Sequence, residues 1–155
     1  MTEFFQSIAD CINSQEVTLG NSVFRLLVSM VLGVLVGAER KRKGQIAGVR
    51  TFALISMGAC LAMLLSIYVP QEYLGLKNGD PGRIAAQVIT GVGFLGGGAM
   101  IHLKGVVRGL TTAAGIWMTA TIGMAVGVGM YWCAIIATVM ILITLTAFEV
   151  YEQRR

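Results

Sequence analysis

Charged residues are scarce in this chain of 155 residues: they make up 13% of it, with eight acidic side chains, twelve basic ones and one histidine. A soluble domain carries about 25% charged residues. Hydrophobic residues make up 55% of the sequence, and the mean hydropathy is +0.75. The composition therefore excludes an ordinary soluble domain and predicts a protein that crosses a membrane several times.

Cysteine is also rare. Cys11, Cys60 and Cys133 have no pair spacing, so they predict neither a disulfide framework nor a metal site. The sequence contains no nucleophile with a neighbouring base, which makes an enzyme the least favoured class, and we expect no cofactor. The net charge of +4 does not indicate nucleic-acid binding, because four of the basic residues form one run, Arg40 to Lys43, beside an apolar stretch. Such a run is typical of the cytoplasmic side of a membrane.

Five apolar stretches are long enough, or nearly so, to cross a bilayer. The expected fold class is an all-α membrane protein, a bundle of five transmembrane helices. The helices should be preceded by an N-terminal segment at residues 1–21 and followed by a short tail at 149–155. The five spans are expected at about residues 22–38, 49–68, 84–101, 110–128 and 130–148.

The distribution of basic residues predicts how this bundle is oriented. Nine of the twelve lie in the first loop, the third loop and the C-terminal tail, which five spans place on one side of the membrane. Basic loops are retained in the cytoplasm. We therefore expect the N-terminus outside the cytoplasm, which is the periplasm in a bacterium, and the C-terminus inside.

The third span and its flanks, Asp80 to Thr112, combine charges, an amide and many glycines in one membrane-length run. Asp80 is a favourable N-cap and Pro81 suits the first helical position, so a helix is expected to begin here. On a helical period, Asp80, Arg83 and Gln87 share one side, which continues as a groove of small residues. Because an unpartnered polar group is costly in lipid, we expect this side to face other helices or a wet cavity.

Two interpretations of these polar residues stay open. In the first, Asp80 only caps the helix and Arg83 only reaches the membrane interface. In the second, which we favour, they are functional, and Asp80→Asn abolishes function without changing the amount of protein in the membrane. At the cytoplasmic end of the bundle, Glu39 can reach into the bundle or pair with Arg50. The complete predicted cluster is Asp80, Arg83, Gln87, Glu39, Arg50 and Arg108.

Glycine is abundant, with twenty residues. Glycines spaced by four positions allow two membrane helices to approach closely. The third span also contains a GxGxxG pattern, but it lacks the preceding strand and the downstream acidic residue of a nucleotide-binding fingerprint. We expect Gly93→Leu or Gly97→Leu to harm assembly more than Leu95→Ala. The predicted packing glycines are Gly33, Gly37, Gly91, Gly93, Gly97, Gly123 and Gly127.

Two large side chains within the spans require an explanation. Arg25, near the start of the first span, must reach outward to the interface or find an acidic partner. Trp117 lies near the middle of the fourth span, whereas tryptophan favours the interface. We therefore expect Trp117 to be buried against other helices.

Three blocks of sequence carry more information than composition. They are GAER at 37–40 with GVRT at 48–51, DPGRIAAQV at 80–88 with GVGFLGGG at 91–98, and VRGLTTAA at 107–114. Together and in this order they resemble the MgtC/SapB family of bacterial inner-membrane proteins. The resemblance covers about residues 22–148, which is the transmembrane domain of the family without its C-terminal ACT-like domain.

The resemblance implies a multi-pass protein of the bacterial inner membrane with a periplasmic N-terminus. It also implies a regulatory role in adaptation to low magnesium or to stress inside a host, including virulence, by modulation of other membrane proteins. One such protein in the family is the F-type ATP synthase. Thr111 stands where virulence-type members carry Asn, which argues against that partner here. The functional positions that carry over are Asp80, Arg83, Glu39 and Arg108.

Two functions therefore compete. The favoured one is a non-enzymatic regulatory or interaction protein whose partners are the lipid bilayer, further copies of itself in a homo-oligomer, or other integral membrane proteins. The alternative is a small ion transporter or channel that uses Asp80, Gln87 and Glu39 as polar stations, that is, as successive binding positions along the path of the ion. The absence of charge between Arg83 and His102 argues against this path, which would depend on an amide, hydroxyls and glycine carbonyls.

Overall fold

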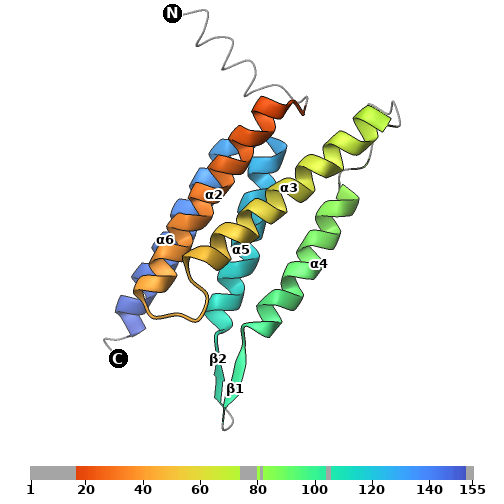
Figure 1. The fold of residues 1–155 in the computed structure, drawn as a ribbon. Coiled ribbons are helices and arrows are strands. Elements are labelled where there is room, and N and C mark those ends of the chain that lie inside the picture. Colours follow the sequence, from red (N-terminus) through yellow and green to blue (C-terminus); the bar gives the residue numbers. More distant parts are fainter. Residues whose placement is uncertain (1–16, 74–79, 81, 104–105, 153–155) are drawn as a thin grey trace, which may run out of the picture.

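A computed structural model describes residues 17–73, 80, 82–103 and 106–152. Pro81, most of the expected N-terminal segment and the end of the tail lie outside the described residues. Within them the chain forms five helices and one β-hairpin (Figure 1). In chain order these are α2 (Leu19–Arg42), α3 (Val49–Tyr73), α4 (Gly82–Gly98), β1 (Ile101–Leu103), β2 (Val106–Arg108), α5 (Leu110–Val128) and α6 (Tyr131–Glu152).

The predicted fold class of five helices is confirmed, and several boundaries differ from the expected ones. The first helix continues to Arg42, because basic side chains in a last turn interact favourably with the negative end of the helix dipole. The second continues through Pro70 to Tyr73. The hairpin was not expected: Ile101, assigned to the third span, pairs instead with Arg108 in an antiparallel register.

Three helices are long and apolar enough to cross a membrane, judged by length and composition among the described residues. They are Leu19–Arg42, Val49–Pro70 and Leu110–Val128. A shorter apolar helix covers Tyr131–Ala147. Helix α4 has 17 residues, which at about 1.5 Å per residue is slightly shorter than a hydrocarbon core of about 30 Å. The orientation of the termini stays a prediction.

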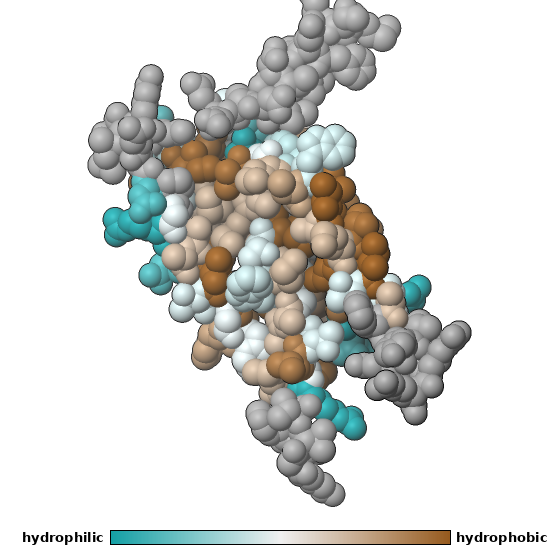
Figure 2. All heavy atoms as spheres, turned by 180° about the vertical axis from the view of Figure 1, so that it is seen from behind, coloured by the Kyte–Doolittle hydropathy of each residue, from teal (hydrophilic) through white to brown (hydrophobic). Residues whose placement is uncertain are grey.

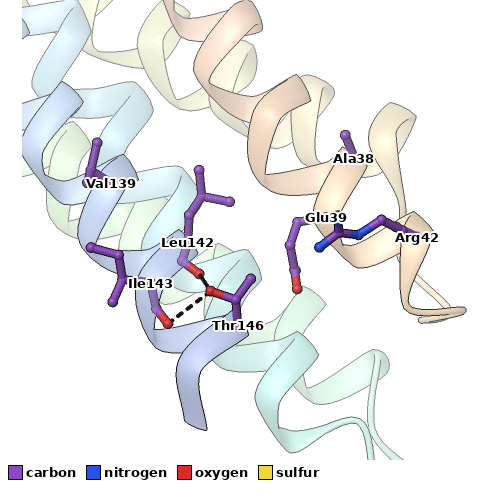
Figure 3. A pocket seen from close by; sticks show the side chains of 7 residues that line it. All are labelled: Ala38, Glu39, Arg42, Val139, Leu142, Ile143 and Thr146. Carbon is purple, nitrogen blue, oxygen red and sulfur yellow. Dashed lines mark hydrogen bonds between the residues drawn. The ribbon is translucent and has the colours of Figure 1, made fainter. Parts of the chain in front are cut away.

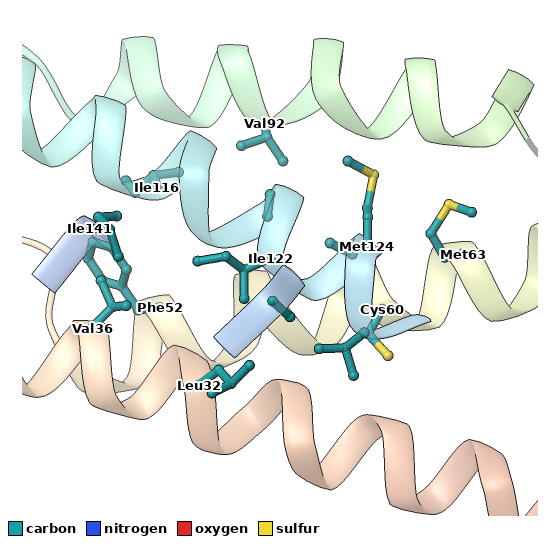
Figure 4. Close-up of a cluster of buried hydrophobic side chains, with 14 of the residues drawn as sticks. Leu32, Val36, Phe52, Cys60, Met63, Val92, Ile116, Ile122, Met124 and Ile141 are labelled. Atoms are coloured by element: carbon teal, nitrogen blue, oxygen red, sulfur yellow. The ribbon is translucent and has the colours of Figure 1, made fainter. Parts of the chain in front are cut away.

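Helix α5 lies at the centre of the arrangement and packs against α2, α3, α4 and α6 (Figure 1). The core between these helices contains Val36, Phe52 and Ile122, each almost completely inaccessible (Figure 4). Helix α4 is attached more lightly, since its buried residues are Val92 and Gly96. Seen from behind, the surface is mainly apolar across its middle, with hydrophilic residues toward its rim (Figure 2). That distribution suits a molecule surrounded by lipid.

Four glycines hold the central helices close together. A Cβ atom on Gly33 would lie 2.7 Å from the Phe52 carbonyl oxygen, and one on Gly37 would lie 2.7 Å from the Val49 Cα atom. On α5, a Cβ atom on Gly123 would overlap the Ser56 carbonyl oxygen, and one on Gly127 would lie 2.7 Å from the Met63 Cβ atom. Helix α3 is therefore held between glycine surfaces of α2 and α5.

The expected burial of Trp117 is wrong. Its side chain is 42% exposed, whereas its neighbour Ile116 is 2% exposed. Helix α5 is surrounded by four helices but not completely, and Trp117 lies on the side that they leave open. Position along the span indicated its depth in the membrane, but depth does not determine which side of a helix is covered.

Candidate functional site

The polar start of α4 lies on the outside of the molecule. The Asp80 Oδ1 atom accepts a hydrogen bond from the Gly82 backbone N–H at 2.9 Å, so the carboxylate caps the helix as its position predicts. Asp80, Arg83 and Gln87 are all exposed. The expectation that this side faces other helices is wrong within a single chain, because α4 packs through the opposite side, which carries Val92 and Gly96.

The glycines of α4 divide into two groups. A Cβ atom on Gly96 would lie 3.4 Å from the Ala113 carbonyl oxygen, so this glycine contacts α5. Gly91, Gly93 and Gly97 have open space, since a Cβ atom on any of them would meet nothing within 4 Å. Their predicted role in close packing therefore has no partner helix among the residues that the structure describes, and it stays a prediction for contacts with another chain.

An apolar groove of about 520 Å³ runs between α3 and α4. Gly58 and Gly91 leave room in it, and Leu54 and Leu95, which are 67% and 52% exposed, stand at its sides. Small residues beside larger apolar ones are the surface against which membrane helices pack. The residues that line this α3/α4 groove are Leu54, Ile55, Gly58, Ala59, Val88, Gly91, Val92 and Leu95.

Glu39 is neutralised by cations of its own helix. Its carboxylate oxygens lie 2.5 Å from the Arg40 Nε atom and 2.9 Å from the Lys43 Nζ atom, and its side chain is nearly inaccessible. The Lys43 Nζ atom also donates a hydrogen bond to the Leu145 carbonyl oxygen, at 2.5 Å, which links α2 to α6. Arg50 is exposed at the start of α3. Glu39 therefore pairs with Arg40 and Lys43, not with Arg50.

The six predicted polar residues do not form one site. Asp80, Arg83 and Gln87 lie outside on α4, which packs against α3 and α5. Glu39 lies on α2 beside α6, and Arg108 is exposed at the end of β2. Among the described residues no three His, Cys, Asp or Glu side chains come together, so that part of the chain offers no metal centre.

Arg25 was expected to reach outward to the interface or to find an acidic partner, but the structure buries it against an amide and a backbone carbonyl, which sequence reasoning did not predict. Arg25 is 2% exposed; its Nε atom donates to the Asn21 Oδ1 atom and its Nη1 atom to the Gly127 carbonyl oxygen, both at 2.8 Å. This carbonyl belongs to the last turn of α5, where a positive charge is favourable. Asn21 precedes Arg25 by one helical turn, and that spacing was the signal available in the sequence.

Comparisons with known proteins match this chain to one protein family. The model of the MgtC family matches residues 26–154. The chain is 45% identical over 129 residues to the putative magnesium transporter YhiD of Escherichia coli K12, covering 82% of this chain and 60% of that protein. It is 42% identical over 120 residues to the protein MgtC of Salmonella typhimurium LT2, covering 77% of this chain and 49% of that protein.

A protein of Haemophilus influenzae with no assigned function is 45% identical over 125 residues, covering 78% of this chain and 52% of its own length. The chain thus spans 49–60% of the length of these relatives. No solved structure matches it.

Proposed function

Since this chain belongs to the MgtC family, we propose that it is a non-enzymatic regulator in the bacterial inner membrane, which binds transmembrane helices of other proteins or of further copies of itself. The name of the Escherichia coli relative refers to magnesium. From the family resemblance we extend the proposal: the regulator acts when magnesium is scarce or when a host imposes stress.

The observation that carries this proposal is the α3/α4 groove together with the open glycines of α4. Gly91 and Gly93 have no neighbour within 4 Å of a Cβ position, whereas glycines of α2 and α5 pack tightly against α3. In a bilayer there is little hydrophobic driving force between helices, and association depends on close van der Waals packing at small residues. The α3/α4 groove offers such a surface to one further helix.

The alternative, transport of an ion, is favoured by the name of the Escherichia coli relative, a putative magnesium transporter. The geometry supports it less. Of its three predicted stations, Asp80 and Gln87 are exposed on α4, whereas Glu39 lines a groove between α2 and α6 and is already neutralised by two cations. These positions do not line a common path in a single chain.

The proposal predicts that Gly91→Leu abolishes partner binding and function while leaving the chain folded. The Cβ atom of the new side chain would meet none of the described atoms within 4 Å, so the backbone is not displaced, and the rest of the leucine would occupy the α3/α4 groove. A lost helix contact of this kind lowers crosslinking to the partner by at least about tenfold, which corresponds to roughly 1.4 kcal/mol. The measurements are in-membrane crosslinking from a cysteine at Leu95 and growth of a deletion strain at low magnesium.

Gly20→Leu is the matched control, because Gly20 also has open space around it but lies on α2, away from this groove. It should crosslink and grow like the unchanged protein. A crosslinked product of twice the mass of the chain would identify a second copy as the partner, and a product of another mass would identify a different protein. Normal crosslinking and normal growth of the Gly91→Leu strain would contradict the proposal.

A further inference from the structure

A second groove, on the opposite part of the molecule, has a different chemistry. It lies between the C-terminal half of α2 and α6 and encloses about 460 Å³ (Figure 3). Its α6 wall consists of Val139, Leu142, Ile143 and Thr146. Val139 and Ile143 are 50% and 56% exposed, and the Thr146 hydroxyl donates its proton to the carbonyl oxygen of Leu142 at 2.8 Å within its own helix, so the wall is mainly apolar. The α2/α6 groove is thus an apolar channel open to the surrounding lipid.

The α2 side of this groove ends in positive charge. Ala38 is the apolar residue that α2 contributes to the groove. Glu39 and Arg42 line the groove at the C-terminal end of α2, which we call its mouth. Both Glu39 oxygens are occupied, by Arg40 at 2.5 Å and 3.0 Å and by Lys43 at 2.9 Å. The carboxylate therefore cannot repel an incoming anion with its full charge. Arg42 is exposed, and Figure 3 shows it reaching from α2 beside Glu39.

We propose that the α2/α6 groove binds an anionic phospholipid, with one acyl chain against Ala38, Val139 and Ile143 and the headgroup phosphate at the Arg42 guanidinium. The two charged residues that line the groove are Arg42 and Glu39, and the charge of Glu39 is already balanced by its ion pairs with Arg40 and Lys43, which leaves Arg42 as the cation that faces the groove. A planar guanidinium suits a phosphate, which it contacts through two parallel hydrogen bonds.

Charge complementarity favours this occupant over a protein helix. A transmembrane helix with apolar side chains at the mouth would offer no charge of opposite sign to Arg42. A phospholipid satisfies both ends at once, because its acyl chain matches the apolar wall and its phosphate matches the cation. Basic residues directly beside a membrane span are typical of anionic-lipid binding. Lys43 also links α2 to α6 through the Leu145 carbonyl oxygen, so a bound lipid would contact two helices that are already joined at this end.

The test is a competition experiment on the purified full chain in mild detergent, followed by native mass spectrometry of the lipid adducts. The probes are dioleoyl phosphatidylglycerol and dioleoyl phosphatidylcholine in equal amounts, which differ in charge and share their acyl chains. The unchanged chain should retain the anionic lipid about fivefold more than the zwitterionic one, as expected for one basic residue at a membrane surface.

Arg42→Gln should bring this ratio close to one, while Lys41→Gln should leave it unchanged. Lys41 is the matched control: it is an equally exposed cation one position earlier, and it faces Gly48 instead of the groove. Ile143→Trp and Val139→Trp, at exposed positions where a larger apolar side chain is tolerated, should lower retention of both lipids by filling the groove.

Three results would overturn the proposal. The first is equal retention of the two lipids by the unchanged chain. The second is an equal loss in the Lys41→Gln and Arg42→Gln variants, which would show attraction by general surface charge. The third is displacement of the lipid by glycerol 3-phosphate alone at the same concentration, which would show a site for a free phosphate without an acyl chain.

Discussion

Gly123→Ala should destabilise the chain by about 3 kcal/mol, at the upper end of the cost of inserting one extra carbon into a well-packed interior. The added Cβ atom would overlap the Ser56 carbonyl oxygen and would lie 2.8 Å from the Ser56 carbonyl carbon. These are backbone atoms in the middle of α3, so no side chain can rotate away. Helices α3 and α5 would have to move apart, and the contacts of the core around Ile122 would be lost with them.

The measurement is the thermal unfolding of the purified variant in mild detergent, together with the amount of protein in the membrane. Gly58→Ala is the control, because Gly58 lies two residues from Ser56 on the same helix and has nothing within 4 Å of a Cβ position. An alanine there should be neutral or stabilising, by up to about 1 kcal/mol. If the two variants unfold at the same temperature, the close approach of α3 and α5 is not a feature of the folded chain.

Arg25→Met should lower the free energy of unfolding by about 3 kcal/mol, since two hydrogen bonds of a charged donor are lost at roughly 1.5 kcal/mol each. Methionine keeps much of the apolar length of arginine but cannot donate to Asn21 or to Gly127. The last turn of α5 would also lose a favourable positive charge. Arg25→Lys should retain about half of the stability difference, because one charged donor remains.

Thermal unfolding measures this effect as well, and Arg50→Met provides the comparison. Arg50 is an exposed cation at the start of α3, where a substitution is expected to change stability by no more than about 0.5 kcal/mol. Equal unfolding temperatures of the Arg25→Met and Arg50→Met variants would mean that Arg25 makes no stabilising contact with the end of α5.

Sequence reasoning succeeded where the signal is local. The length and periodicity of the apolar stretches predicted five helices, and Asp80 was recognised as the cap of α4. The family blocks predicted membership of the MgtC family. The basic run did not mark where the first helix ends, because charged residues extend a helix beyond the membrane as readily as they form a loop.

The side of each helix that is covered could not be predicted, because it depends on how distant elements are placed. Gly123 and Gly91 look alike in the sequence, yet the first would clash with α3 and the second has open space. For the same reason the burial of Trp117 was expected wrongly, and the contact of Arg25 with Gly127, 102 residues further along the chain, was not foreseen. Periodicity identifies the sides of a helix, while tertiary packing decides which of them is buried.

We propose that the chain regulates other membrane proteins and does not itself carry an ion. The most direct measurement is magnesium uptake into liposomes that contain the purified chain and an enclosed fluorescent magnesium indicator, with a divalent-cation ionophore to show that the vesicles report entry. We predict uptake equal to that of empty liposomes, because Asp80, Gln87 and Glu39 do not line one path. Rapid uptake that requires the chain and disappears in the Asp80→Asn or Glu39→Gln variant would show that the chain is a transporter and not a regulator.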